Sequence, residues 1–109
     1  MIEVKEYVDE SGKSPYAKWH NRLNARAAVK VSAALYRLEQ GNFSNTKGVG
    51  GGIFEYKIDF GPGYRIYFGK DGERIVIILG GGTKKRQNQD IDAAKIHWQD
   101  YKARKRQSE

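Results

Sequence analysis

The chain has 109 residues and no cysteine, and its 20 lysines and arginines outnumber its 13 aspartates and glutamates to give a formal net charge of +7. The length predicts a single domain over residues 1–109, and the lack of cysteine excludes disulfides and thiolate metal sites. The longest apolar run, Ile75–Leu79, is too short to cross a bilayer, and no apolar signal stretch follows the N-terminus, so we expect a cytoplasmic protein with no membrane partner. The positive charge is typical of proteins that bind nucleic acid or acidic proteins, although it also fits simple solubility.

The first segments of the chain predict a strand and a short helix. Residues 2–8 have an extended pattern and predict a first strand. Ser14 and Pro15 then provide a helix N-cap and a proline at the first helical position. The apolar stripe of this helix consists of Tyr16, Trp19 and Leu23.

A second, longer helix is predicted after Asn24, which either ends the first helix or caps the second. Its predicted buried face consists of Ala28, Val31, Leu35 and Leu38. Gly41 stands where a C-terminal cap belongs, so the two helices form a helical hairpin.

A loop is predicted over residues 42–52, because this segment is rich in glycine and polar residues and has no periodicity. Its Lys47–Gly52 run resembles a phosphate-binding loop only superficially, since no Lys-Ser or Lys-Thr pair follows the glycines. We interpret it as a flexible connection into the next strand.

Three strands in close succession are predicted after that loop. Apolar and polar residues alternate over 54–60 and again over 64–68, with a turn at Gly61–Gly63 between them. Residues 75–79 are apolar throughout, as in a central strand, and Gly80–Gly82 is predicted to end it. A last amphipathic helix is defined by Ile91, Ala94, Trp98 and Tyr101. The element order is therefore β-α-α-β-β-β-α, which is an α+β fold.

The two alternating strands place polar side chains on a common face. These side chains are Glu55, Lys57 and Asp59 on the first strand, and Arg65 and Tyr67 on the second. Because apolar residues occupy the opposite face, we expect the polar set to form one solvated sheet surface. At its rim we expect Lys84, Lys85 and Arg86.

A surface of lysine, arginine and tyrosine suits RNA chemistry. Lysine and arginine bind phosphate, and tyrosine stacks on bases. RNA held there can be cut without a metal, when a base takes the 2′-hydroxyl proton, cations stabilise the phosphorane and an acid protonates the leaving oxygen. No histidine or carboxylate cluster suits a transition metal, so neither a metal nor another cofactor is expected. The alternative is an ordinary solvated sheet face, with Glu55 and Arg65 as a cross-strand ion pair.

The segment Glu55–Phe68, EYKIDFGPGYRIYF, resembles the core of the RelE/ParE toxin superfamily, and more closely its HigB-like branch of addiction-module killer proteins, often carried by phages. Residues Gly80–Lys95, GGGTKKRQNQDIDAAK, are similar to the glycine, lysine and helix signature of that branch. The resemblance implies a RelE-like fold, in which a small, mostly antiparallel sheet packs against a helical hairpin and a C-terminal helix. It implies the toxin of a type II toxin–antitoxin system, a ribosome-dependent mRNA endoribonuclease (mRNA interferase) that arrests translation. It also implies a cognate antitoxin, commonly a helix-turn-helix DNA-binding protein, through which alone the toxin reaches operator DNA.

The resemblance assigns site residues as well. RelE-like nucleases carry a lysine pair on the first meander strand, of which only Lys57 is matched, because Glu55 occupies the neighbouring position on that face. Their meander arginine matches Arg65, and a basic residue after the last strand matches the Lys84-Lys85 pair. The terminal tyrosine or histidine of some members has no direct counterpart, and the candidate replacements are Tyr67 and His97. The expected catalytic residues are Arg65, Tyr67, Lys57, Lys84 and Lys85, and the expected RNA-binding residues are Glu55, Tyr64, Arg86 and Gln87.

Two alternatives to RNA cleavage stay open at this point. ParE-type members of the superfamily inhibit DNA gyrase by binding alone, and an inactive toxin fold can serve only as a repressor component. Arg65, Tyr67 and the Lys84-Lys85 pair favour RNA, since a gyrase binder needs no phosphate-facing sheet. The antitoxin has two possible docking modes: over the sheet face, or beside the helices of residues 15–40, which offer the larger surface.

Overall fold

The computed structural model describes residues 1–108. Within that range the elements follow the order β1 (Glu3–Glu6), α1 (Pro15–His20), α2 (Ala25–Glu39), β2 (Thr46–Gly50), β3 (Ile53–Ile58), β4 (Tyr64–Asp71), β5 (Ile75–Thr83), a 3-10 helix η1 (Lys84–Arg86) and α3 (Gln87–Ser108). The predicted α+β class is confirmed. None of the helices in the described range is both long enough and apolar enough to cross a membrane.

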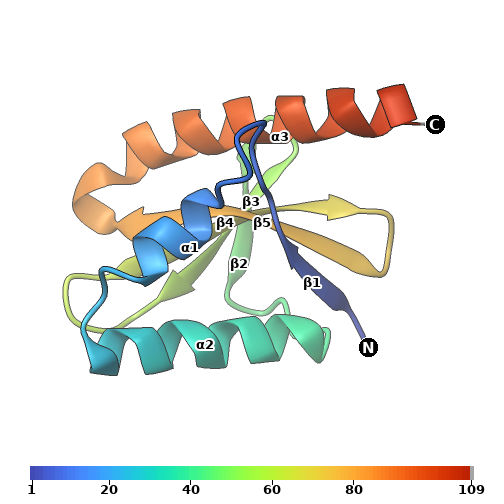
Figure 1. The fold of residues 1–109 in the computed structure, drawn as a ribbon. Helices are drawn as coiled ribbons and strands as arrows, with labels where there is room; N and C mark the ends of the chain where they lie inside the picture. The colour runs from blue at the N-terminus through green and yellow to red at the C-terminus, as the bar shows by residue number, and fades with distance from the viewer. Residues whose placement is uncertain (109) are drawn as a thin grey trace.

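The strands form one five-stranded sheet in the order β1-β5-β4-β3-β2. β1 runs parallel to β5, and the other neighbouring pairs are antiparallel. Figure 1 shows α2 on one face of the sheet and α3 on the other, with α1 beside the strands. The sheet is therefore mixed, and helices cover both of its faces.

The face toward α1 and α2 carries one apolar core. Ile66, Phe68 and Ile78 of the central strands meet α2 there. The buried residues of α2 are Ala27, Val31, Ala34 and Leu38. The predicted stripe was therefore one residue late at two positions, because Ala28 and Leu35 lie half-buried at the margin of this contact.

The face toward α3 carries a second core, although the sequence predicts a solvated surface for the polar residues of β3 and β4 on this face. Tyr67, Ile77 and Leu79 pack there with Ala94 and Trp98 of α3. The prediction of a solvated sheet face is therefore wrong over this part of the sheet. The physical reason is that the apolar stripe of α3 needs an apolar partner, which the two-sided strand β5 supplies.

The helix ends follow local chemistry that the sequence shows. The Ser14 hydroxyl accepts a hydrogen bond from the Ala17 N–H at 3.0 Å, with Pro15 at the first helical position. Asn24 caps α2 by accepting from the Ala27 N–H at 2.9 Å. Gly41 has a φ of +79°, which favours glycine at a helix C-terminus. These three predictions are confirmed.

The prediction of a loop over residues 42–52 is wrong, because Thr46–Gly50 forms the edge strand β2. It pairs with β3 in antiparallel register, Lys47 opposite Glu55, and an irregularity interrupts the ladder between Gly48 and Gly50. An edge strand buries little of its surface, so its sequence carries no apolar alternation, and its glycines imitate a loop.

The Gly80–Gly82 run does not end β5, as the sequence predicted, but lies inside the strand. A Cβ atom on Gly81 would lie 2.4 Å from the Trp19 ring, and one on Gly82 would lie 1.8 Å from the Asp90 carboxylate. The glycines therefore allow α1 and α3 to approach the two faces of β5 closely.

Candidate nucleic-acid interface

A buried ion pair lies at the centre of the predicted site. Glu55 on β3 is 1% exposed and Arg65 on β4 is 5% exposed. The Arg65 Nε lies 3.6 Å from the Glu55 Oε1. Lys57 stands directly opposite Arg65 and Tyr67 opposite Glu55, so the pair is diagonal across the two strands. The ion pair that the sequence offered as an alternative is thus present, and it is desolvated.

Neighbouring elements hold this pair in place. The Gln87 side chain, at the start of α3, donates a hydrogen bond of 2.6 Å to the second carboxylate oxygen of Glu55. Lys47 on β2 reaches the first oxygen at 4.0 Å. Arg65 donates a long hydrogen bond of 3.5 Å from Nη1 to the Gly63 carbonyl. Glu55 therefore links β2, β4 and the first turn of α3.

The first turns of α3 cover polar atoms that have no hydrogen-bond partner in the described residues. These atoms are the Arg65 Nε, the Tyr67 hydroxyl and the Asp90 Oδ2. Burial, followed by the charges of Glu55 and Asp90, raises the pKa of Tyr67 well above its usual value. Burial likewise raises the pKa of Asp90, against the opposing charge of Arg86. Tyr67 is therefore protonated at neutral pH and has no contact with solvent.

The tyrosines of the predicted site do not meet on one surface. Tyr64 is buried in the core on the α1 and α2 face, where its ring lies 6.3 Å from that of Trp19. Tyr67 lies in the opposite core, under α3. Neither ring can stack on an RNA base in this conformation, although the sequence predicted an RNA contact for Tyr64.

Exposed cations on β2, β3 and η1 flank the strands that hold the ion pair, and we call them the basic rim. The rim consists of Lys47, Lys57, Lys84, Lys85 and Arg86, all exposed. The Lys84 N–H donates to the Gly63 carbonyl at 2.9 Å, which places η1 beside the start of β4. Residues Lys84–Gln89 line an open hollow of about 520 Å³. The predicted Lys57, Lys84, Lys85 and Arg86 are thus accessible, and Lys47, which lies on the strand missed from the sequence, joins them.

The basic rim offers phosphate ligands rather than metal ligands. Within residues 1–108, no group of three histidine, cysteine, aspartate or glutamate side chains is placed to hold a metal ion. Lysine and arginine bind phosphate through their charge and through hydrogen bonds from several N–H donors.

Tyr67 and His97 are the two candidates to replace the terminal tyrosine or histidine of some RelE-like nucleases. His97, like Tyr67, does not lie on the rim. It is half-buried on α3, where its ring stacks on Tyr7 at a centroid distance of 4.9 Å. Burial lowers the pKa of His97, against the raising effect of Asp9 and Asp100. His97 is therefore neutral at physiological pH, and its packing ties α3 to the segment after β1.

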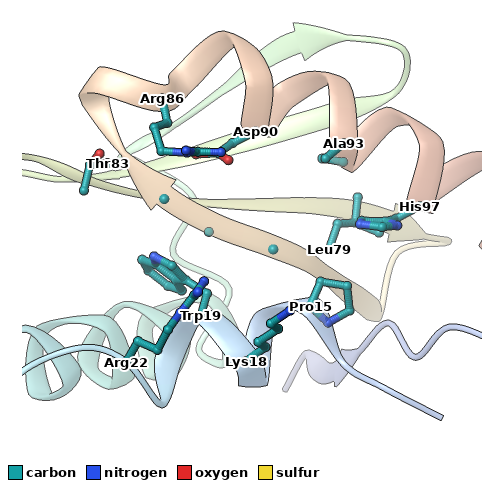
Figure 2. A pocket seen from close by; sticks show the side chains of 14 residues that line it. Pro15, Lys18, Trp19, Arg22, Leu79, Thr83, Arg86, Asp90, Ala93 and His97 are labelled. Atoms are coloured by element: carbon teal, nitrogen blue, oxygen red, sulfur yellow. The ribbon is translucent and has the colours of Figure 1, made fainter. Parts of the chain in front are cut away.

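A separate cleft opens between α1 and α3, over the last residues of β5 (Figure 2). It encloses about 530 Å³. Figure 2 shows Lys18, Trp19 and Arg22 on one side of the strand and Arg86 and Asp90 on the other. This cleft could not be predicted from the sequence, because its floor is the glycine segment that the sequence predicts to end β5.

Comparison with known proteins adds one relative. No family model matches the chain. A protein of Haemophilus influenzae, described as an uncharacterized protein, is 44% identical over 82 residues, which cover 74% of this chain and 83% of the relative. That description names no activity, so the function of this chain must be inferred from its own residues.

Proposed function

We propose that this chain, which belongs to the same family as the Haemophilus influenzae protein, is the toxin of a type II toxin–antitoxin pair and a metal-independent, ribosome-dependent mRNA endoribonuclease. The observation that carries the proposal is the basic rim, whose exposed cations gather around one buried ion pair. The RelE/ParE-like string Glu55–Phe68 runs through the two strands that hold this pair. A RelE-like arrangement of the α+β fold is part of the same proposal.

In the proposed reaction the rim binds and polarises the RNA backbone. Lys84 and Lys85 of η1 contact phosphate oxygens, and Lys57 of β3 lies opposite Arg65 of β4. The 2′-hydroxyl attacks the adjacent phosphorus as water takes its proton, the rim cations stabilise the negative charge of the phosphorane, and the 5′-oxygen leaves after it takes a proton from water. This gives a 2′,3′-cyclic phosphate end and a 5′-hydroxyl end.

Arg65 and Tyr67 lie beneath the rim rather than on it. The guanidinium of Arg65 is bound to Glu55, and Gln87 closes the site from above. Contact between Arg65 and phosphate therefore requires the first turn of α3 to move. In the conformation described here, Arg65 acts on the rim by fixing the relative positions of β3 and β4.

The proposed partner is an antitoxin, of the helix-turn-helix type, encoded beside this gene. The outward face of α2 exposes Val29 and Tyr36, which are 68% and 62% accessible. Exposed apolar side chains on a helix suit packing against a partner helix, which supports docking beside the helices.

The test of this function is induced expression in a bacterial host, with mapping of mRNA ends and a growth measurement. We expect growth arrest and new 5′-hydroxyl ends within translated messages. The exposed pair Lys84→Ala/Lys85→Ala should lose about a hundredfold in cleavage, the scale for losing transition-state charge stabilisation. The matched control Arg26→Ala/Lys30→Ala, two exposed cations on α2, should cleave like the wild type.

The reaction should be insensitive to a chelator of transition metals, such as 1,10-phenanthroline, in a ribosome assay that keeps its magnesium. Loss of cleavage with the chelator and recovery with added zinc would contradict metal independence. Equal cleavage by the rim variant and the wild type would remove the rim from the reaction.

A binding function without catalysis is the second candidate, and the burial of Arg65 and Tyr67 favours it. A DNA gyrase inhibitor needs no phosphate-facing sheet, and it would arrest growth with broken or relaxed DNA and intact mRNA ends. A toxin fold that serves only as a repressor component would cause no arrest. The same expression experiment therefore separates the three functions.

A further inference from the structure

The strand β5 is longer than the neighbour that covers its edge. β1 pairs with residues Ile75–Ile78 only, and a hydrogen bond of 2.9 Å from the Tyr7 N–H to the Ile78 carbonyl follows that ladder. β5 then continues to Thr83. Within residues 1–108, no strand pairs with Leu79–Thr83 on the side away from β4. An unpaired sheet edge presents backbone groups that a further strand can bind.

This edge lies at the bottom of the cleft of about 530 Å³ between α1 and α3 (Figure 2). A Cβ atom on Gly80 would meet no atom within 4 Å, so open space lies over the sheet at Gly80, whereas Trp19 and Asp90 pack closely on Gly81 and Gly82. The glycines of this edge have no side chains to cover its backbone. The cleft thus combines an unpaired strand edge, partly exposed at Gly80, Gly81 and Thr83, with walls from two helices.

The charges on the two walls are mostly positive. Lys18 and Arg22 lie on the α1 side, and Arg86 lies on the α3 side, where Asp90 is the opposing carboxylate. Side chains of an extended strand alternate in direction, so an incoming strand would present one set to each wall. The set facing α1 would meet Lys18 and Arg22, and the set facing α3 would meet Arg86 beside Asp90. A second copy of this chain is a poor occupant, since each copy carries a net charge of +7.

We propose that this cleft binds an extended, acidic segment of a partner protein, which adds to the sheet as a strand along Leu79–Thr83. Backbone hydrogen bonds to the β5 edge supply the affinity, and the wall cations select acidic side chains. RNA also suits a basic cleft, but it cannot form a strand ladder with the backbone of β5. The inference concerns recognition of a polypeptide and does not depend on RNA cleavage.

The test begins with selection from a random peptide library displayed on phage, against the full chain. Peptides linked to their own mRNA are unsuitable for this selection, because the basic protein would bind the RNA. We expect the enriched peptides to carry more aspartate and glutamate than lysine and arginine and to lack proline in their central positions. A synthetic version of the best peptide, methylated on alternate backbone nitrogens, should lose about a hundredfold in affinity, since each methyl group removes a donor and blocks the ladder.

Variants of the protein then locate the binding site. Lys18→Glu/Arg22→Glu should weaken binding of the unmethylated peptide by about tenfold or more, from lost charge complementarity. Gly80→Val should weaken it similarly by filling the open floor, without altering charge. The matched control Arg26→Glu/Lys30→Glu makes the same charge change on α2, and its effect should stay within about twofold. Thermal unfolding confirms that each variant is folded.

Several results would overturn the proposal. Failure to enrich any peptide, or enrichment of neutral or basic sequences, removes the acidic strand as occupant. Affinity that survives backbone methylation shows that no strand is added. Equal loss in the α2 control shows that only net charge matters. If a single-stranded oligouridine binds with the same dependence on Lys18 and Arg22 while no peptide does, the cleft is a nucleic-acid surface instead.

Discussion

Replacing Glu55 with glutamine tests whether the Glu55–Arg65 pair is as desolvated as its geometry indicates. The change keeps the shape of the side chain and an acceptor for Gln87 but removes the negative charge. Arg65, at 5% exposure, then keeps only its 3.5 Å hydrogen bond to the Gly63 carbonyl. Within residues 1–108, the Arg65 Nε already lacks a hydrogen-bond partner. The guanidinium would be left charged in a dry environment.

The expected loss follows from that burial. Breaking one side of a buried ion pair costs about 3–5 kcal/mol, because the remaining charge is uncompensated. Lys47, the other cation near Glu55, is largely exposed and gives Arg65 no compensation. We expect Glu55→Gln to lower the free energy of unfolding by about 3 kcal/mol, out of the roughly 5–15 kcal/mol typical of a domain.

The measurement is urea unfolding at neutral pH, followed by the fluorescence of Trp19 and Trp98, which pack on the sheet from opposite faces. The matched control is Glu3→Gln, since Glu3 pairs with Lys5 at 3.9 Å on the surface with 62% of its side chain exposed. An exposed pair contributes about 1 kcal/mol or less. The double variant Glu55→Gln/Arg65→Met should recover most of the lost free energy of unfolding, because it removes the uncompensated charge of Arg65.

A loss for Glu55→Gln no larger than that of the Glu3 control would refute the reasoning, since it would mean that water reaches the pair. A double variant as unstable as the single one would refute it in another way. In that case the loss would come from the hydrogen bond to Gln87 or from packing, and not from an uncompensated guanidinium.

Four further variants test the contacts around α1 and α3. Gly81→Ala should lower the free energy of unfolding by about 1–3 kcal/mol, because its Cβ would be overpacked against Trp19. Gly80→Ala meets open space and should be neutral or slightly stabilising. Equal effects of the two variants in urea unfolding would contradict the close approach of α1. Ser14→Ala should cost about 1 kcal/mol by removing the N-cap of α1, measured in the same way. Burial lowers the pKa of His97 in the folded protein below its unfolded value of 6.5. The contribution of neutral His97 to the free energy of unfolding is therefore complete above pH 6.5 and is lost as the pH falls through the pKa of the folded state. We expect the free energy of unfolding to decrease toward acid pH, and to decrease less in His97→Phe. An identical pH profile in that variant would show that His97 does not titrate with unfolding.

The parts of the fold that follow from local chemistry could be predicted from the sequence. Ser14 and Asn24 are recognisable caps because a side-chain oxygen satisfies a backbone N–H within the next three residues. The strands β3 to β5 are recognisable because β-branched and aromatic residues recur at the spacing of a pleated sheet. Each of these signals lies within one short window of the chain.

The errors arose where the outcome depends on distant residues. The edge strand β2 forms because Lys47 and its neighbours pair with β3, and nothing in residues 42–52 themselves indicates this. Gly81 is glycine because Trp19 packs on it, more than sixty positions earlier in the chain, so its meaning is invisible in a local window. The alternation of apolar and polar residues on β3 and β4 predicts one buried and one solvent-exposed face, whereas α3 covers part of the face predicted to be exposed.

The site was affected by the same limit. The sequence identified most of the cations that gather at the rim, since Lys57, Lys84 and Lys85 are exposed as expected. It placed Arg65 and Tyr67 beside them on the surface, whereas both are buried. Which polar residues of a sheet face reach solvent depends on where the last helix lies, and that position is fixed by packing over the whole sheet.

The first turn of α3 consequently decides how Arg65 takes part in any reaction at the rim. Gln87 holds that turn to Glu55, and the Tyr67 hydroxyl and Asp90 Oδ2 beneath it have no hydrogen-bond partner in the described residues. Such a segment opens at lower free energy than one packed on apolar residues. If Arg65 contacts phosphate directly, opening must precede cleavage.

We therefore expect Gln87→Ala to speed amide hydrogen exchange at the start of α3 and to raise the rate of RNA cleavage about threefold or more, since a larger share of molecules would expose Arg65. The control is Gln99→Ala, an exposed residue further along α3 and outside the hollow that Lys84–Gln89 line, which should change neither rate. Faster exchange with unchanged or slower cleavage would show instead that Arg65 works from its buried position. Arg65→Lys would then retain activity only as far as it retains the ion pair to Glu55 and the alignment of β3 with β4.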